Sequence, residues 1–205
     1  MNMKPLLIVS LVLLNTITFA QTNVLFIGDS LTAGYGVQKE HSYPSLVEKE
    51  LKETHKIDAK IINGSISGST SASGPSRLKW YLKAKPQVLV LALGANDGLR
   101  GFKVEDTKKN LEQTISIAKE NNIQVILVGM QMPPNYGEQY TSSFKKMFSD
   151  LLTKHHLKSV PFLLEKVAGE KDYNQEDGIH PNEKGHVQMA KNVMPTLLSV
   201  LKEKK

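Results

Sequence analysis

Short apolar runs alternate with segments of helical periodicity along most of this 205-residue sequence. The runs are rich in Val, Ile and Leu at successive positions, as in strands buried on both faces of a sheet. They occupy residues 24–27, 59–62, 88–93, 125–130 and 160–163, and amphipathic helical segments lie at about 43–55, 75–84, 106–121, 140–156 and 182–203. This alternation predicts parallel strands joined by right-handed crossovers, with helices on both faces. We therefore expect a three-layer α/β/α fold with a five-stranded parallel sheet, formed as a single domain by residues 21–205.

The first twenty residues have the pattern of a secretory signal peptide. A short basic start precedes the apolar residues 6–14, and small residues at Thr18 and Ala20 form a cleavage site. An uncleaved membrane anchor is the alternative, but the apolar stretch is short for a bilayer span. We therefore expect cleavage after Ala20 and export to the periplasm or the medium. With no cysteine in the sequence, neither lipoprotein anchoring nor a disulfide is available.

The chain carries a formal net charge of +6, from 26 Lys and Arg against 20 Asp and Glu. The basic residues are dispersed, for example at 108–109, 145–146 and 202–205, which is typical of a solvated surface. Weak attraction to an anionic membrane surface is an alternative interpretation. Neither a basic helix nor an aromatic stacking pattern is present, so nucleic acid is not an expected partner. Nothing in the sequence requires more than a monomer.

Four polar segments follow strand-like runs: GDSL at 28–31, NGSISG at 63–68, GAND at 94–97 and DGIH at 177–180. In an open parallel sheet the carboxyl ends of the strands lie along one crevice, where ligands bind. Together the segments supply a serine, backbone N–H donors, an asparagine amide and an Asp/His pair. These are the parts of an acyl-transfer site that uses a serine nucleophile.

Ser30 and His180 are the candidate nucleophile and base. A serine just after a buried strand can project its hydroxyl into the crevice, although a helix N-cap is the alternative role. It needs a base, and the base needs an orienting acceptor. Asp177 lies three residues before His180 and can turn back onto Nδ1, which leaves Nε2 for the serine. The alternative for this pair is a surface turn with an incidental histidine.

The remaining polar segments supply donors for a developing oxyanion. The Asn96 amide is a neutral donor, and the glycines of segment 63–68 offer backbone N–H groups, although both segments also suit ordinary turns. The Gly-rich loop at 31–36 matches neither a P-loop nor a dinucleotide fingerprint. The other histidines lack zinc-ligand spacing, and His155 lies in a Lys-rich helical pattern where we expect it to be solvated. No metal is predicted.

In all four segments the sequence resembles the SGNH hydrolases, also called the GDSL family. It is most similar to the bacterial periplasmic subgroup of thioesterase I, lysophospholipase and arylesterase. The stretches that carry this likeness are LFIGDSLTAGYG, NGSISGSTSASG, LALGANDGLRG, MPPNYG and DGIHPN. The resemblance runs from about Asn23 to the last helical segment, and it implies a flavodoxin-like SGNH-hydrolase fold that needs no cofactor.

The resemblance also implies residue roles. Ser30 would be the nucleophile, His180 the general base and then acid, and Asp177 its orienting partner. The oxyanion donors would be the Ser30 N–H, the Gly68 N–H and the Asn96 side-chain amide. Segment 94–101 resembles a mobile loop of the subgroup, and 133–137 would line an acyl groove. The implied substrate-binding residues are Asp29, Asp97, Gly98, Leu99, Met132, Pro133, Tyr136 and Ile179.

The expected function is hydrolysis of acyl esters through an acyl-Ser30 intermediate. Aryl esters, lysophospholipids and acyl thioesters are the expected substrate classes. One alternative is a carbohydrate O-acetyl esterase, since related families use the same kind of site on acetylated sugars. A second alternative, from another class, is a non-catalytic flavodoxin-like module that binds lipids, in which Ser30 would be inert to a fluorophosphonate probe.

Overall fold

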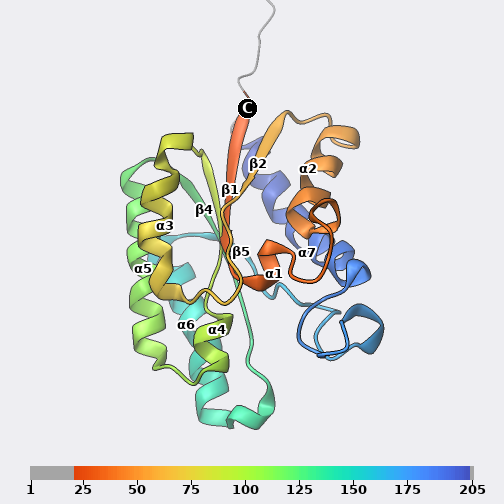
Figure 1. The fold of residues 1–205 in the computed structure, drawn as a ribbon. Helices are drawn as coiled ribbons and strands as arrows, with labels where there is room; N and C mark the ends of the chain where they lie inside the picture. Colours follow the sequence, from red (N-terminus) through yellow and green to blue (C-terminus); the bar gives the residue numbers. More distant parts are fainter. Residues whose placement is uncertain (1–20, 204–205) are drawn as a thin grey trace, which may run out of the picture.

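The computed structural model describes residues 21–203, and the predicted signal peptide lies outside them. The chain forms one parallel sheet in the order β2-β1-β3-β4-β5 (Figure 1). The strands are β1 (Thr22–Gly28), β2 (Ala59–Asn63), β3 (Val88–Ala92), β4 (Gln124–Val128) and β5 (Lys158–Val160). This is the order of flavodoxin-like sheets, in which β1 and β3 are adjacent at the point where the direction of winding reverses. The predicted fold is confirmed.

Helices cover both faces of the sheet, as the alternating pattern requires. The longer helices are α2 (Tyr43–Glu53), α3 (Gly74–Tyr81), α5 (Val104–Glu120), α6 (Glu138–His155) and α7 (Glu183–Lys202). Helix α2 packs on α7 on one face, and α3 and α6 flank α5 on the other (Figure 1). Among residues 21–203, none of the helices combines the length and the apolar character needed to cross a bilayer.

The core lies between the two helical layers. Every residue of β3 is buried, and β1 is buried from Val24 to Gly28, so both strands contribute side chains to both faces. Phe26 meets Tyr43 of α2 edge to face at 5.8 Å, and Phe144 meets Phe148 within α6 at 5.6 Å. Burying such side chains contributes roughly 1.5–3 kcal/mol each. Without disulfides, this packing holds the strand ends in place.

Two parts of the predicted element map were wrong. The fifth strand is Lys158–Val160 rather than 160–163, because Pro161 has no N–H to continue the ladder and the chain leaves the sheet there. Two short helices, α1 (Ser30–Ala33) and α4 (Ala95–Leu99), follow β1 and β3 directly. Each spans about one turn, too little for a helical period to be visible in the sequence. Both carry candidate site residues.

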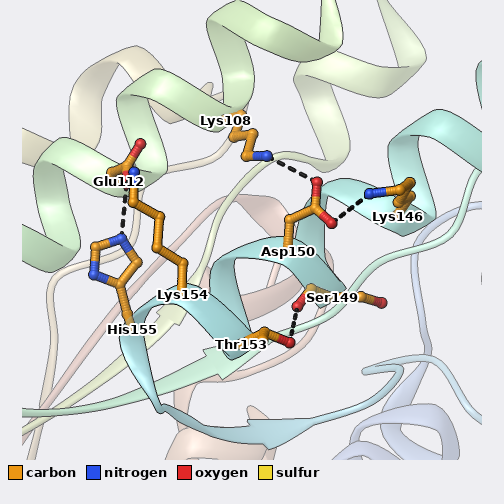
Figure 2. A network of polar contacts seen from close by, with 8 residues as sticks. All are labelled: Lys108, Glu112, Lys146, Ser149, Asp150, Thr153, Lys154 and His155. Atoms are coloured by element: carbon orange, nitrogen blue, oxygen red, sulfur yellow. Dashed lines mark hydrogen bonds and ion pairs between the residues drawn. The ribbon is translucent and has the colours of Figure 1, made fainter.

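Helices α5 and α6 are also joined by a charged network on the surface (Figure 2). Its members are Lys108, Glu112, Lys146, Asp150, Lys154 and His155. Nε2 of His155 donates to Oε1 of Glu112 at 2.8 Å, and the His155 side chain is only 13% exposed, so the expectation that it is solvated was wrong. Hydrogen bonds from Lys108 and Lys146 lower the pKa of Asp150. Such exposed pairs contribute little individually, and this network lies away from the crevice.

Candidate active site

Ser30 is placed by the abrupt change from strand β1 to helix α1. Asp29 caps the helix, its carboxylate accepting the Leu31 N–H at 3.1 Å, and Ser30 is the first helical residue. The turn requires glycine at position 28, because a Cβ there would lie 2.3 Å from the Thr32 hydroxyl oxygen. The nucleophile candidate therefore stands at the carboxyl end of β1, partly exposed, with its backbone fixed on both sides.

Ser30, His180 and Asp177 form a continuous hydrogen-bonded chain. The Ser30 hydroxyl lies 3.0 Å from Nε2 of His180, and Nδ1 of the same ring lies 2.7 Å from Oδ2 of Asp177. The other carboxylate oxygen, Oδ1, accepts the backbone N–H groups of Ile179 and His180, each at 3.0 Å. The fold therefore brings these three side chains together, although Ser30 and His180 are 150 positions apart in the sequence.

The carboxylate fixes the tautomer of the imidazole. The hydrogen bonds from the His180 backbone and side chain, followed by that from Ile179, lower the pKa of Asp177 to about 2. At neutral pH the ionised carboxylate can only accept, so Nδ1 carries the proton and the Nε2 lone pair faces Ser30. Unlike a buried triad acid, Asp177 is on a surface loop, with 41% of its side chain exposed.

The three predicted oxyanion donors lie on neighbouring segments that are tied to one another. Within residues 21–203, neither the Ser30 N–H nor the Gly68 N–H donates to another residue. The Asn96 amide donates one N–H to the Ser69 carbonyl at 3.1 Å, which orients the amide, and its second N–H has no acceptor in the part of the chain that the structure describes. Ile66 N–H donates to Gly28 O at 3.2 Å, joining this segment to the start of the nucleophile turn.

Two arginines hold these segments together and were not among the predicted site residues. Arg77 donates to the Gly28 carbonyl at 3.1 Å and to the Ser69 hydroxyl at 2.8 Å. Arg100 donates to the Gly68 carbonyl at 3.0 Å, which ties the end of α4 to the loop after β2. Neither residue could be singled out beforehand, because an isolated arginine is usually a surface residue.

Residues 26–188 match the model of the GDSL-like lipase/acylhydrolase family. The chain belongs to this family. It is 38% identical to esterase TesA of Pseudomonas aeruginosa over 193 residues, which cover 94% of this chain and 95% of the relative. It is 36% identical to thioesterase 1/protease 1/lysophospholipase L1 of Escherichia coli K12 over 173 residues, 84% of this chain and 81% of the relative.

A solved structure supports the same assignment. The crystal structure of the psychrotrophic esterase EstA from Pseudoalteromonas sp., inhibited by monoethylphosphonate, superposes with a TM-score of 0.83. That esterase is 31% identical, and the match covers 89% of this chain and 100% of the other. The predicted resemblance is confirmed, and this chain is a GDSL-family hydrolase.

Two carboxylates predicted to bind substrate are instead buried in this GDSL hydrolase. Asp29 is 1% exposed and Asp97 is 2% exposed. Asp97 accepts the backbone N–H of Ser71 at 2.8 Å and also its hydroxyl, so it joins α4 to the loop after β2. Both side chains thus point into the protein in this structure, because a motif shows which residue is present and not which way it points, and substrate binding by these residues stays a prediction.

The other predicted substrate-binding residues differ in how far they are buried. Gly98 and Met132 are buried against each other, so close that a Cβ on Gly98 would lie 2.2 Å from the Met132 sulfur. Tyr136 is half-buried and donates its hydroxyl to the Leu99 carbonyl at 2.9 Å. The members that expose side chains to solvent are Leu99, Pro133 and Ile179. Within the predicted group, these three therefore present exposed apolar side chains.

The buried Asp29 carboxylate makes a prediction about stability. Burial raises its pKa from 3.8 to about 6, and Oδ2 has no hydrogen-bond partner among residues 21–203. Because the folded pKa is above the ordinary value, the fold loses stability as pH rises from about 4 to about 6. We therefore expect the free energy of unfolding of Asp29→Asn, measured relative to that of the native chain, to be about 3 kcal/mol higher at pH 8 than at pH 4. Urea unfolding at both pH values measures this difference. A pH-independent difference would contradict it.

Within residues 21–203, no three His, Asp or Glu side chains are grouped so that they could hold a metal ion. The predicted chemistry rests on the serine, the imidazole and the hydrogen-bond donors described above.

Proposed function

We propose that this chain hydrolyses carboxylic esters and thioesters through a covalent acyl-Ser30 intermediate. The observation that carries the proposal is the chain of hydrogen bonds from Ser30 Oγ to His180 Nε2 at 3.0 Å and from Nδ1 to Asp177 at 2.7 Å. Adjacent free N–H donors on the segments after β1, β2 and β3 complete the arrangement. Membership of the GDSL-like lipase/acylhydrolase family points to the same chemistry.

Acylation begins when the Ser30 oxygen attacks the substrate carbonyl and its proton passes to Nε2 of His180. The carbonyl oxygen becomes an oxyanion and receives hydrogen bonds from the Ser30 N–H, the Gly68 N–H and the Asn96 amide. As the tetrahedral intermediate collapses, His180 gives the proton to the departing alcohol or thiol. Asp177 stabilises the imidazolium that exists between these two transfers. Water then attacks the acyl-serine with His180 as base, and Ser30 is regenerated.

The test is a series of p-nitrophenyl esters from acetyl to long acyl chains, together with a fluorophosphonate probe. Hydrolysis with stoichiometric labelling of Ser30 is the expected result. The chain-length profile separates the remaining possibilities, since a strong preference for acetyl would favour a carbohydrate O-acetyl esterase. An intact, folded protein that neither hydrolyses these esters nor takes up the probe would exclude the hydrolase and favour a lipid-binding module.

Lysophospholipids are the substrate class that we propose for the cell. The signal-peptide pattern of residues 1–20 supports export, and an exported enzyme meets few acyl-CoA thioesters. The name of one relative, thioesterase 1/protease 1/lysophospholipase L1, includes activity of this class. Release of fatty acid from a bacterial lipid extract tests the substrate, and fractionation of expressing cells tests the periplasmic location. An extract that yields no fatty acid counts against lysophospholipids while leaving the ester chemistry intact.

The Asn96 amide gives a quantitative prediction for this mechanism. We expect Asn96→Ala to lower kcat by about 10²- to 10³-fold, because one donor to the oxyanion is lost, with little change in KM. Steady-state kinetics on one p-nitrophenyl ester measures the effect. Asn121→Ala is the matched control, since the Asn121 amide donates only to Ile117 O at the end of α5. A kcat within a factor of about three of the native value would exclude Asn96 from the oxyanion site.

A further inference from the structure

Two loops meet beside the catalytic pair and are joined by one side chain. The first loop follows α1 and contains Tyr35, and the second, residues 174–181, carries Asp177 and His180. The side-chain amide nitrogen of Gln175 donates to the Tyr35 carbonyl at 2.8 Å and to the Pro181 carbonyl at 3.0 Å. Both N–H groups of one amide are therefore used to connect the two loops.

Each end of this connection leads directly to a reacting residue. On the first loop, the Tyr35 N–H donates to the Ser30 carbonyl at 3.1 Å. On the second, the backbone N–H of Gln175 donates to the His180 carbonyl at 2.8 Å. The backbone of the nucleophile and the backbone of the base are thus linked through Tyr35 and Gln175, by a path separate from the five-stranded sheet.

The contact between the loops is also tightly packed. Gly36 has a left-handed φ of 77°, and a Cβ at this position would lie 2.1 Å from Oε1 of Gln175. The Tyr35 ring lies over the imidazole of His180, with 4.5 Å between the ring centroids. A change at Gln175 therefore alters the loop that packs on the base as well as the loop that carries it.

We propose that Gln175 is a positioning residue, whose amide fastens the nucleophile loop to the base loop and so maintains the 3.0 Å contact between Ser30 and His180. The proposal rests on the hydrolase function proposed above. His180 needs such a fastening because it lies on a surface loop, where its carboxylate partner is 41% exposed. A misplacement of about 1 Å in a reacting group can cost about 10²-fold in rate.

Two substitutions test the proposal on the complete mature chain. Gln175→Ala removes the bridge, and Gln175→Glu keeps its size but directs a carboxylate oxygen at two carbonyl oxygens. We expect both to lower kcat and the rate of fluorophosphonate labelling of Ser30 by about 10- to 100-fold, with KM for a short p-nitrophenyl ester nearly unchanged. The Gln175→Glu deficit should shrink from pH 8 to pH 5, because a protonated carboxyl can again donate. The Gln175→Ala deficit should not depend on pH.

Gln188→Glu is the matched control, since that amide donates to Asn192 on the same helix, α7. Thermal unfolding of every variant separates misplacement of the base from loss of fold. The proposal is overturned if both Gln175 variants keep native kcat and labelling rates, or if their losses disappear once the folded fraction is taken into account. Failure of the native protein to label or hydrolyse would overturn it together with the hydrolase function, whereas an active native protein with unaffected variants overturns the positioning role alone.

Discussion

Ser30→Ala and His180→Ala should each lower kcat by about 10⁶-fold, and the double variant should lose no more than either single one. The reason is the 3.0 Å contact between the serine hydroxyl and Nε2 of His180. An alanine at 30 leaves nothing to attack the carbonyl, and an alanine at 180 leaves a hydroxyl that cannot transfer its proton. Two residues that perform one step cannot contribute independently.

Steady-state kinetics on a p-nitrophenyl ester measures all three variants, with single-turnover assays where rates are low. Ser142→Ala is a suitable control, because that hydroxyl lies on the surface of α6 and donates to the Gln139 carbonyl of the same helix. Multiplicative losses in the double variant would contradict a shared step. A Ser30→Ala enzyme with more than about 1% of native activity would assign the nucleophile to another residue.

Asp177→Asn should be more damaging than Asp177→Ala. In the native site Oδ1 accepts two backbone N–H groups, so an asparagine must place its oxygen there and its NH₂ against Nδ1 of His180. The imidazole then carries its proton on Nε2, facing Ser30, and cannot act as base. We expect a loss of about 10⁴-fold in kcat, the size that this error of tautomer produces in a buried triad.

In Asp177→Ala, no side chain at position 177 favours either tautomer of the His180 imidazole. Because the native carboxylate is 41% exposed, water can reach Nδ1 in the alanine variant, and we expect a loss of about 10²-fold. Kinetics of the two variants at pH 8 measures the order. Equal losses would show that the charge of Asp177 matters more than the tautomer it selects, and a greater loss in the alanine variant would show that its orienting hydrogen bonds do. Since the Asp177 pKa is about 2, its own protonation does not limit activity in ordinary buffers.

The sheet was predictable because its strands are buried on both faces and therefore apolar at successive positions. The same property led to wrong bounds for the fifth strand. Val160, Phe162 and Leu163 are apolar because they pack in or against the core, but Pro161 ends the ladder of strand hydrogen bonds. The reacting groups were predictable because each lies in a short polar segment; Ser30 and Asn96 directly follow strands, whereas Asp177 and His180 lie in the loop between β5 and α7. Their common location follows from parallel topology rather than from any side-chain contact visible in the sequence.

The residues that position the site segments could not be predicted from the sequence. Arg77, Arg100 and Gln175 each bond to a backbone carbonyl on a distant segment, and Gln175 reaches Tyr35 across 140 positions. Every residue has a backbone carbonyl, so the residue type at the accepting position does not reveal that such a contact is made. The burial of Asp29 and Asp97 was not predicted either, because an acidic residue in a polar segment is usually solvated.

His180 lies three positions before α7, and the inner face of α7 covers α2. During synthesis, the ribosome therefore delivers the nucleophile and all the oxyanion donors long before the base. A nascent chain that ends before residue 177 can pair β1, β2 and β3 but has no group to activate Ser30. The apolar face of α2 also lacks its cover until α7 emerges. Hydrolytic activity and a closed core thus both depend on the segment from residue 177 onward, so a chain that lacks this segment cannot hydrolyse an ester through Ser30.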